Sequence, residues 1–381
     1  MNRGEKHGQV WSIILAGGDG ERLRSLTERW LGYHKPKQYC TFTGTRSMLQ
    51  HTLDRADVLT TLERRVTVIS RSHLWDLSLQ LSEEKTGKLL VQPANRDTAA
   101  AVFLGLAYVR AQDPQGTVVL YPSDHFVHPE ERFTAVVSSA IVAAERLRRW
   151  LFLLGASPDK VESEYGWIQP GAEFGRMNGH SVRAVQAFVE KPSVDWCRRA
   201  MSAGALWNTL VLAANVKILW SMGWSCLPEV MPFFEKYQEA IGTLKEEIVL
   251  EEIFKEMPAR NFSTDLLQRV YRQVAVIELK EVIWSDWGRS RRIVDTLIQT
   301  GKVQHFPVVL FGSKYWEGLV DWLRRPVESE GMISGDDLGL FYLSDDPGEV
   351  VPYIKAVLEQ RPEAVEPGAE PHVRPEKADA Q

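Results

Sequence analysis

The chain has 381 residues, of which 44% are hydrophobic and 25% are charged, enough for the full core of one large domain and something smaller. Its formal net charge of -5 gives no general attraction to nucleic acid or to an anionic membrane, so a phosphate-bearing partner needs local cationic sites. The three cysteines lack metal-ligand spacing, which argues against a zinc site or a disulfide framework. The sequence shows no apolar signal segment and no apolar run long enough to span a membrane, so we expect the protein to be located in the cytoplasm.

Hydrophobic runs bounded by turn residues predict a series of strands separated by helices. The predicted strands are Val10–Leu15, Val66–Ile69, Leu89–Val91, Thr117–Tyr121, Leu151–Leu154, Val182–Val189 and Val274–Ile277. The predicted helices are Arg46–Leu59, Leu74–Leu81, Thr98–Ala111 and Glu131–Arg148, with a further helical and charged region from Leu219 to about Gln268. This alternation predicts an α/β domain with a Rossmann-like, mainly parallel sheet flanked by helices.

A glycine-rich turn, Leu15–Leu23, directly follows the first predicted strand. Its glycines allow backbone amides to approach a polyphosphate, and Arg22 supplies a fork of donors. Leu23 stands where a dinucleotide-binding fingerprint needs a third glycine, and the Gly-Lys-Ser/Thr of a P-loop is missing. The turn alone is therefore compatible with a nucleotide-binding loop or with an ordinary strand-to-helix connection.

A second motif, Pro36-Lys37-Gln38, follows closely. Together with the Gly-Gly-x-Gly-x-Arg-Leu loop it resembles the signature of the sugar nucleotidylyltransferases, which join a nucleoside triphosphate (NTP) to a sugar 1-phosphate and release pyrophosphate. The resemblance implies the nucleotide-diphospho-sugar transferase fold. It also implies that Lys37 holds the α-phosphate and stabilises the charge on the departing pyrophosphate, while Arg22 grips the β- and γ-phosphates. The implied nucleotide-binding loop consists of Leu15, Ala16, Gly17, Gly18 and Gly20.

Three later segments resemble the nucleotide and metal segments of the same family. Gln92–Ala99 is similar to the base and ribose segment, which implies nucleotide contacts for Gln92, Arg96 and Thr98. Tyr121–His125 and Trp284–Gly288 resemble the metal-binding segments, which implies that Asp124 and Asp286 hold Mg²⁺. We leave His125 and His128 out of the predicted site, because a histidine beside a metal carboxylate is more often a structural group than a ligand.

The sugar-binding segments follow the family order as well. Ser163–Ile168 resembles the sugar-contacting turn, in which Gly166 lets the substrate come close. Phe188–Pro192 contains the Val-Glu-Lys-Pro element, which implies that Lys191 binds the phosphate of the sugar 1-phosphate and Glu190 a sugar hydroxyl. Trp207–Thr209 resembles the Trp-Asn-Ser turn, from which Asn208 reaches the sugar.

The choice of base and sugar remains open within this family. Asn95–Ala99 and Trp207–Thr209 are most similar to the mannose-1-phosphate guanylyltransferases, which favours GTP and mannose 1-phosphate as partners and GDP-mannose as product. Gln92, however, stands where those enzymes commonly have Glu, and it leaves a thymidylyltransferase open. Leu210 and Val211 replace the usual Gly-Met, which we expect to narrow or reshape the sugar pocket.

A different class of function is also compatible with the sequence. Glu21 places a carboxylate in the phosphate loop where the family usually has Thr or Ser. Together with Leu210 and the C-terminal fragment described below, it motivates the hypothesis of a catalytically weak, nucleotide-sugar-binding regulatory protein. The presence of both aspartates and both lysines argues against that hypothesis, because a mere binder has less need of a metal pair.

The C-terminal region resembles another family. Leu297–Lys302, Phe306–Gly312 and Tyr315–Trp316 are similar to the lysine decarboxylase-like phosphoribohydrolases, but that family's Pro-Gly-Gly-x-Gly-Thr loop is absent, so we expect no such activity. We expect a nucleotidylyltransferase domain at 1–295 and a small α/β fragment at 296–360 with the order strand-helix-strand-helix. The tail 361–381, rich in Pro, Glu and Ala, is expected to be disordered. A homo-oligomer is left open.

Overall fold

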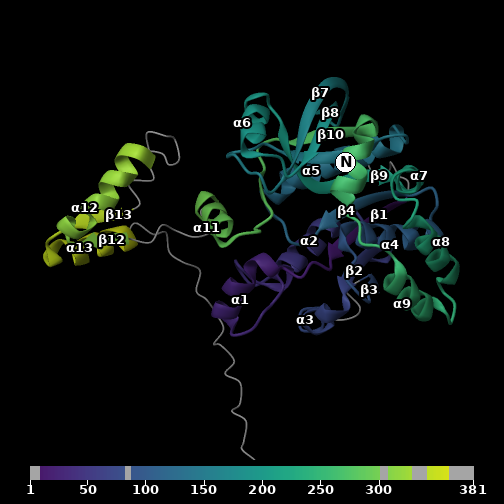
Figure 1. Ribbon diagram of the computed structural model, residues 1–381, viewed down its shortest axis with the longest axis horizontal. Coiled ribbons are helices and arrows are strands. Elements are labelled where there is room, and N and C mark those ends of the chain that lie inside the picture. The colour runs from purple at the N-terminus through teal and green to yellow at the C-terminus, as the bar shows by residue number, and fades with distance from the viewer. Residues whose placement is uncertain (1–8, 82–86, 301–307, 328–340, 360–381) are drawn as a thin grey trace, which may run out of the picture. The chain divides into compact units, whose positions relative to one another are not determined.

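The predicted alternation of strands and helices builds a large sheet in the computed structural model (Figure 1). The structure describes residues 9–81, 87–300, 308–327 and 341–359, and the chain divides into two compact units, residues 1–296 and 297–381. None of the helices in these described ranges is both long and apolar enough to cross a membrane.

The described strands of the first unit form a nine-stranded sheet in the order β3-β2-β1-β4-β9-β6-β10-β8-β7. Strands β8 and β9 run opposite to the others, so the sheet is mainly parallel and the predicted fold class is confirmed. The bounds are β1 (Val10–Ala16), β2 (Arg65–Ser70), β3 (Lys88–Gln92), β4 (Thr117–Pro122), β6 (Leu151–Ala156), β7 (Gly166–Met177), β8 (His180–Glu190), β9 (Leu206–Asn215) and β10 (Val274–Leu279). A small antiparallel ribbon pairs β5 (Phe126–His128) with β11 (Ile283–Ser285).

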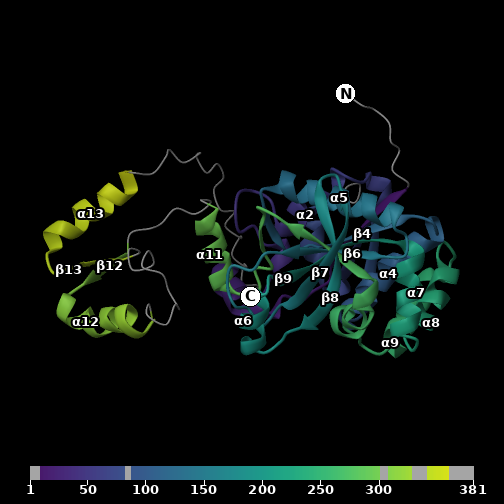
Figure 2. The ribbon, with the colours of Figure 1, turned by 90° about the horizontal axis from the view of Figure 1, so that it is seen from above.

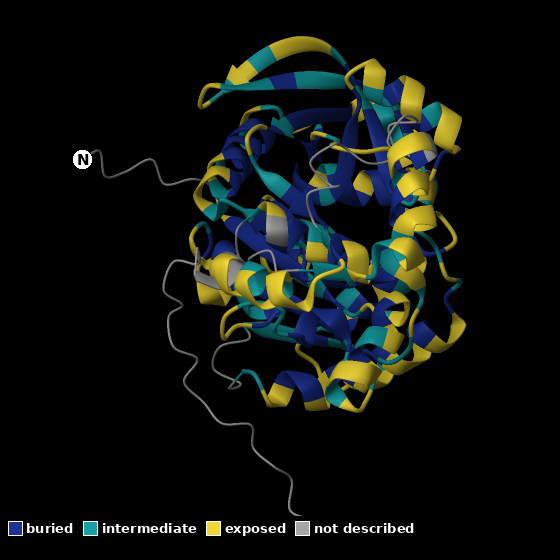
Figure 3. Ribbon diagram, turned by 90° about the vertical axis from the view of Figure 1, so that its left-hand side faces the viewer, coloured by how far each residue is buried: buried dark blue, intermediate teal, exposed yellow. Residues whose placement is uncertain are grey.

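Helices cover both faces of this sheet (Figure 2), and the strands between them are buried (Figure 3). One hydrophobic core lies under α4 and α7 to α9, the other under α2, α5 and α6. The helices are α1 (Arg24–Leu31), α2 (Met48–Asp57), α3 (Leu74–Ser78), α4 (Asp97–Gln112), α5 (Glu130–Arg146), α6 (Val194–Ser202), α7 (Val216–Cys226), α8 (Met231–Ala240), α9 (Glu246–Glu256), α10 (Gln268–Val270) and α11 (Ser290–Gln299). Gly105 lets α4 lie close to β1, because a Cβ there would be 2.6 Å from Ile13 Cγ2.

Two segments that the sequence indicated as turns belong to long strands instead. Gly166 begins β7, and Trp207–Thr209 lies inside β9. Polar Asn208 and Thr209 interrupt the apolar pattern of β9, so the hydrophobic periodicity does not predict a strand there. The register of β9 against β6 shifts here, since Asn208 pairs with Gly155 and Leu212 with Leu153. The extra residues of β9 form a bulge, a common way to aim a side chain at a site.

In the second unit, β12 (Val308–Phe311) pairs in parallel with β13 (Phe341–Ser344). The described helices there are α12 (Ser313–Trp322) and α13 (Pro347–Glu359), so the expected order of strand, helix, strand and helix is present. The predicted tail 361–381 lies outside the described residues. The domain boundaries at 295 and 360 stay predictions.

The position of the site follows from the strand order. From β1 the chain proceeds to β2 on one side, whereas β4 lies on the other side of β1. In open α/β sheets, ligands bind beyond the carboxyl ends of the strands where the order reverses in this way. The glycine-rich loop follows β1 and Asp124 follows β4, so both belong to that crevice.

Candidate active site

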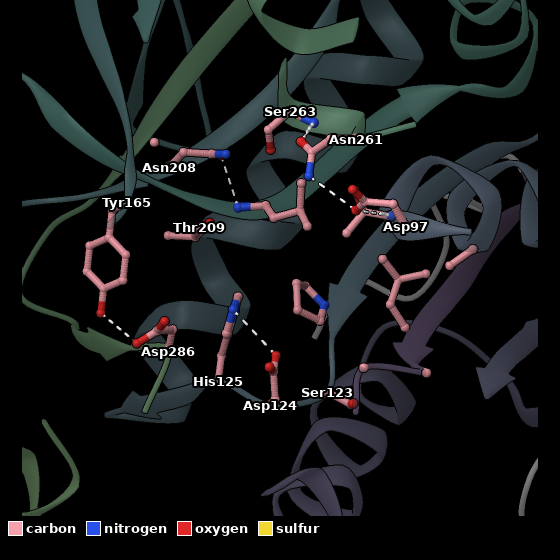
Figure 4. A pocket seen from close by; sticks show the side chains of 18 of the residues that line it. Asp97, Ser123, Asp124, His125, Tyr165, Asn208, Thr209, Asn261, Ser263 and Asp286 are labelled. Carbon is pink, nitrogen blue, oxygen red and sulfur yellow. Dashed lines mark hydrogen bonds and ion pairs between the residues drawn. The ribbon is translucent and has the colours of Figure 1, made fainter. Parts of the chain in front are cut away.

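A cleft of about 430 Å³ opens beyond the carboxyl ends of β1 and β4 (Figure 4). It brings together residues that are distant in the sequence. The predicted site residues that line it are Leu15, Gly17, Gly18, Arg22, Lys37, Gln92, Thr98, Asp124, Gly166, Glu190, Lys191, Asn208 and Asp286. Gly20 lines an adjoining pocket, together with Arg22, Lys37 and Asp124.

The glycine-rich loop and the Pro-Lys-Gln segment fit tightly against each other. The Gln38 amide donates hydrogen bonds to the carbonyls of Ala16 (3.1 Å) and Gly18 (2.8 Å). Gly20 has φ of 67°, and a Cβ there would lie 3.1 Å from the backbone nitrogen of Lys37. A side chain at Gly17 would come within 2.7 Å of Gln92 Oε1. Gly20 is therefore required for conformation and space, and Gly17 for space.

Lys37 connects three segments of the site. Its side chain is buried, and its Nζ lies 2.8 Å from Asp124 Oδ2 and donates a 2.5 Å hydrogen bond to the carbonyl oxygen of Asp286. An ammonium held this rigidly is preorganised to face an incoming phosphate, because its position costs no rearrangement when charge develops.

Both aspartates are held in the ionised form. Burial would raise the pKa of Asp286, but Lys37 and Arg292 outweigh it and hold that pKa far below its usual range. Burial likewise opposes ionisation of Asp124, and Lys37 with His125 brings its net pKa below the ordinary value. In Figure 4 both carboxylates lie on the same side of the cleft.

The aspartate pair has the ligand chemistry that a divalent cation prefers. Asp286 Oδ1 accepts hydrogen bonds from Tyr165 Oη (2.7 Å) and from the backbone nitrogen of Gly288 (2.9 Å), which fixes the carboxylate. Within the described ranges, no group of three or more His, Cys, Asp or Glu could hold a metal. Mg²⁺ is commonly bound through one or two carboxylates, with substrate phosphates and water completing its shell, so two carboxylates suffice.

Arg22 faces the same carboxylates from the loop side. Its guanidinium is half-exposed and lies 3.5 Å from Glu164 and 3.6 Å from Asp286 Oδ2. These long ion pairs leave it available to exchange a carboxylate for a phosphate. Glu21, the unusual carboxylate of the loop, instead accepts hydrogen bonds from Arg24 at 2.9 and 3.2 Å on the surface.

The predicted sugar residues line the same cleft, and three of them lie close together. A Cβ on Gly166 would lie 2.5 Å from Glu190 Oε2 and 3.2 Å from Asn208 Cβ, so glycine is needed where these side chains meet. Burial raises the pKa of Glu190, although neighbouring Lys191 opposes this. Lys191 itself is exposed and lines the cleft.

Besides Gly20, which lines the adjoining pocket, two predicted nucleotide residues do not line this cleft. The Arg96 guanidinium turns away and donates to the carbonyls of Phe254 (2.7 Å) and Lys255 (3.0 Å) at the end of α9. Ala16 is buried, and its carbonyl accepts hydrogen bonds from Gln38 and Tyr39 beneath the loop. The neighbour Asp97 lines the cleft instead of Arg96.

Comparison with known proteins agrees with this arrangement. Residues 11–300 match the protein family described as nucleotidyl transferase. The chain belongs to the nucleotidyl transferase family. Residues 294–354 match a second family, described as "Possible lysine decarboxylase".

Named relatives of this nucleotidyl transferase narrow the comparison. A mannose-1-phosphate guanylyltransferase of Salmonella typhimurium is 29% identical over 283 residues, covering 72% of this chain and 56% of that protein. One from Escherichia coli K12 is 26% identical over 309 residues, covering 79% and 63%. The chain thus spans about three fifths of the length of these curated relatives. A solved structure from Thermus thermophilus, described as a mannose-1-phosphate geranyltransferase, has a TM-score of 0.65 and 25% identity, covering 79% of this chain and 82% of that one.

Several cleft residues of this nucleotidyl transferase escaped the sequence prediction. His125 lines the cleft, and burial lowers its pKa to about 4, so the ring is neutral at pH 7. Trp284 Nε1 donates to His125 Nδ1 (3.3 Å), which leaves the ring proton on Nε2, toward Asp124. Asn261 and Ser263 also line the cleft, but they come from a region whose sequence indicated only charged helices.

Arg292 forms a buried charge network next to the cleft. Its side chain is only 5% exposed, and it contacts Asp286 Oδ1 (2.8 Å), Glu162 Oε2 (2.6 Å) and Glu164 Oε2 (2.7 Å). Its guanidinium also lies over the Tyr165 ring, 4.6 Å from the centroid. Arg292 therefore fixes the orientation of Asp286, although nothing in its own sequence context on α11 indicated this.

We expect Arg292→Met to lower the free energy of unfolding by about 3–5 kcal/mol, because three carboxylates lose a buried partner. Arg289→Met is the matched control, since Arg289 pairs with Glu164 but is 62% exposed, and it should cost less than about 1 kcal/mol. Chemical denaturation of both variants measures the difference. Equal stability of the two variants would contradict this role of Arg292.

Proposed function

We propose that the protein transfers a nucleotidyl group from an NTP, GTP by preference, to a sugar 1-phosphate, mannose 1-phosphate by preference, giving GDP-mannose and pyrophosphate. The observation that carries the proposal is the position of Lys37 between Asp124 and Asp286, in a cleft that is also lined by the glycine-rich loop and by Glu190, Lys191 and Asn208. The names of the Salmonella and Escherichia relatives support the choice of GTP and mannose.

The proposed chemistry needs no covalent intermediate on the protein. A phosphate monoester is already a nucleophile, so a sugar phosphate oxygen can attack the α-phosphorus in line as pyrophosphate leaves. Two polyanions must then be held together, and Arg22, Lys37 and Lys191 supply positive charge along one cleft. Glu190 and Asn208 would orient the sugar through its hydroxyl groups.

Asp124 and Asp286 would hold the divalent cation, Mg²⁺ by preference. When bound, that cation would neutralise phosphate charge at the reacting centre. Lys37 stays within reach of both aspartates and would hold the α-phosphate beside them. The ionised state of both carboxylates suits this role at neutral pH.

A thymidylyltransferase is the near alternative, and Gln92 is the observation that favours it. Gln92 is buried at the edge of the cleft and offers one acceptor and one donor group. Guanine presents two adjacent donors, N1–H and N2–H, whereas thymine presents a donor beside an acceptor. Glutamine matches the thymine pattern, so dTTP belongs in the test.

Pyrophosphate release tests the proposal. The purified protein with Mg²⁺ is assayed with GTP, dTTP, UTP, ATP and CTP, each crossed with mannose, glucose and other sugar 1-phosphates. We expect the highest kcat/KM with GTP and mannose 1-phosphate. Another productive pair would keep the reaction and change the substrates. No release with any pair would contradict the proposed activity and favour a nucleotide-sugar-binding regulatory protein.

We further propose that residues 1–295 form the transferase domain, that 296–360 form a fragment without its own catalysis, and that the protein acts in the cytoplasm. The free, buried state of Cys40, Cys197 and Cys226 supports a reducing compartment. Size-exclusion chromatography with light scattering tests whether the protein is a homo-oligomer.

A further inference from the structure

Leu210 holds a backbone conformation that leucine rarely adopts. Its φ is 56°, in the left-handed region, where the Cβ of an ordinary residue crowds the following carbonyl. Asp97 (62°) and Lys191 (47°) share this feature, and all three residues line the cleft. Strained backbone of this kind is kept where the surroundings force it and is concentrated at functional sites. Asp tolerates the left-handed region better than Leu or Lys, so Leu210 and Lys191 are more unusual there than Asp97.

The bulge of β9 explains why Leu210 stays in this conformation. The Leu210 amide donates to Asn208 Oδ1 (3.0 Å), which fixes the two residues to each other. Thr209 Oγ1 donates to the Leu154 carbonyl (2.6 Å) and accepts from the Val211 amide (3.2 Å). These three bonds lock the backbone on both sides of Leu210.

The consequence is an apolar side chain among the predicted sugar residues of the cleft, next to Asn208. Leu210 is half-buried, packs against the core beneath and still lines the cleft beside Asn208 and Thr209 (Figure 4 shows these two). Space is already short beside Asn208, because even a Cβ on Gly166 would meet Glu190 and Asn208. An isobutyl group occupies space and offers no hydrogen bond to a polar substituent.

We propose that Leu210 determines the sugar specificity of this cleft and restricts it to simple hexose 1-phosphates by excluding N-acylated amino-sugar 1-phosphates. This inference rests on the proposed function. An N-acyl group needs more room than a hydroxyl, and its amide N–H and C=O would lie unpaired against the leucine.

Matched substrate pairs test this inference. Glucose 1-phosphate is compared with N-acetylglucosamine 1-phosphate, and mannose 1-phosphate with N-acetylmannosamine 1-phosphate, in wild type, Leu210→Ala and Leu210→Gly. We expect wild type to favour the hexose in each pair by at least about a hundredfold in kcat/KM, and both variants to reduce that ratio at least about tenfold. The smaller side chains should act by raising kcat/KM for the N-acetyl substrate.

Asn178→Gly is the control for placing glycine at a position of positive φ. Asn178 has φ of 47° and is exposed in the β7–β8 turn, away from the cleft, so the substrate ratio should not change. If Leu210→Gly does not fold, Leu210→Ala carries the test, since it keeps a Cβ.

Calorimetric Kd values for the same sugar phosphates separate the two proposals. A wild-type protein that binds sugar phosphates without turnover would contradict the proposed function. The Kd ratios within the substrate pairs would then test whether Leu210 excludes the N-acetyl sugar phosphates. The inference is overturned if wild type does not discriminate within the pairs, or if both Leu210 variants retain the wild-type ratio.

Discussion

Replacing Lys37 by methionine should lower kcat by about 10²–10³-fold, the range found when one preorganised donor to a transition state is removed. Lys37 is buried, and its ammonium contacts Asp124 and the Asp286 carbonyl. Methionine keeps much of the side-chain volume but removes the charge that would meet the α-phosphate. Steady-state kinetics with the best substrate pair measures the loss, and circular dichroism checks that the fold persists.

Lys35→Met is the matched control for Lys37→Met. Lys35 lies two residues away and is half-buried, but it lines neither the main cleft nor the adjoining pocket. Its replacement should change kcat less than about threefold, equivalent to roughly 0.6 kcal/mol. Near-wild-type turnover of a folded Lys37→Met protein would exclude the proposed role of this lysine.

The second large effect is expected from Asp124→Asn and Asp286→Asn, each of which should reduce kcat/KM by about a hundredfold or more. Loss of one carboxylate removes charge that would bind the divalent cation, which contributes several kcal/mol in such sites. At Asp286 an asparagine oxygen can still accept from Tyr165 and Gly288, so the fold should persist. A titration with Mg²⁺ should show half-maximal activity at a higher metal concentration in both variants.

Asp295→Asn serves as the control for these aspartate variants. Asp295 is a neighbouring, half-exposed carboxylate that pairs with Lys160 and lies outside the cleft lining. Its variant should keep the wild-type metal dependence. In wild type, EDTA should abolish activity and added Mg²⁺ should restore it. Full activity in EDTA would contradict the metal role of both aspartates.

Local sequence patterns predicted the site residues that lie in the turn directly after a strand. The glycine-rich loop after β1 and Asp124 after β4 were both predicted, and the fold places both at the same crevice. Such motifs are short, and their glycines and charges sit at fixed spacing from a buried strand. This is why an α/β fold and about half of the cleft residues could be predicted from the sequence.

Arg96 and Arg292 were not predicted correctly, and the physical cause is the same for both. The groups that bind each guanidinium lie far away in the sequence. Arg96 sits in a segment resembling the base-binding one, but carbonyl groups at the end of α9 capture its guanidinium. Arg292 gains its importance only when α11 meets Glu162, Glu164 and Asp286. No pattern along a helix reveals such partners.

Leu210 illustrates a third limit of the sequence. The substitution of a leucine for glycine was visible, but a residue letter carries no φ angle. Only the bulge between β9 and β6 shows that the leucine is forced into a glycine conformation at the cleft.

The most direct test of the central claim follows the phosphorus atoms. The protein is incubated with mannose 1-phosphate and GTP labelled with ³²P at either the α- or the γ-position, and the products are separated by chromatography. The proposed transfer predicts that the α-label appears in a nucleotide sugar and the γ-label in pyrophosphate, and that Lys37→Met forms both products about 10²–10³-fold more slowly. An α-label that never enters a nucleotide sugar, with this pair or with any other NTP and sugar 1-phosphate, would contradict the account.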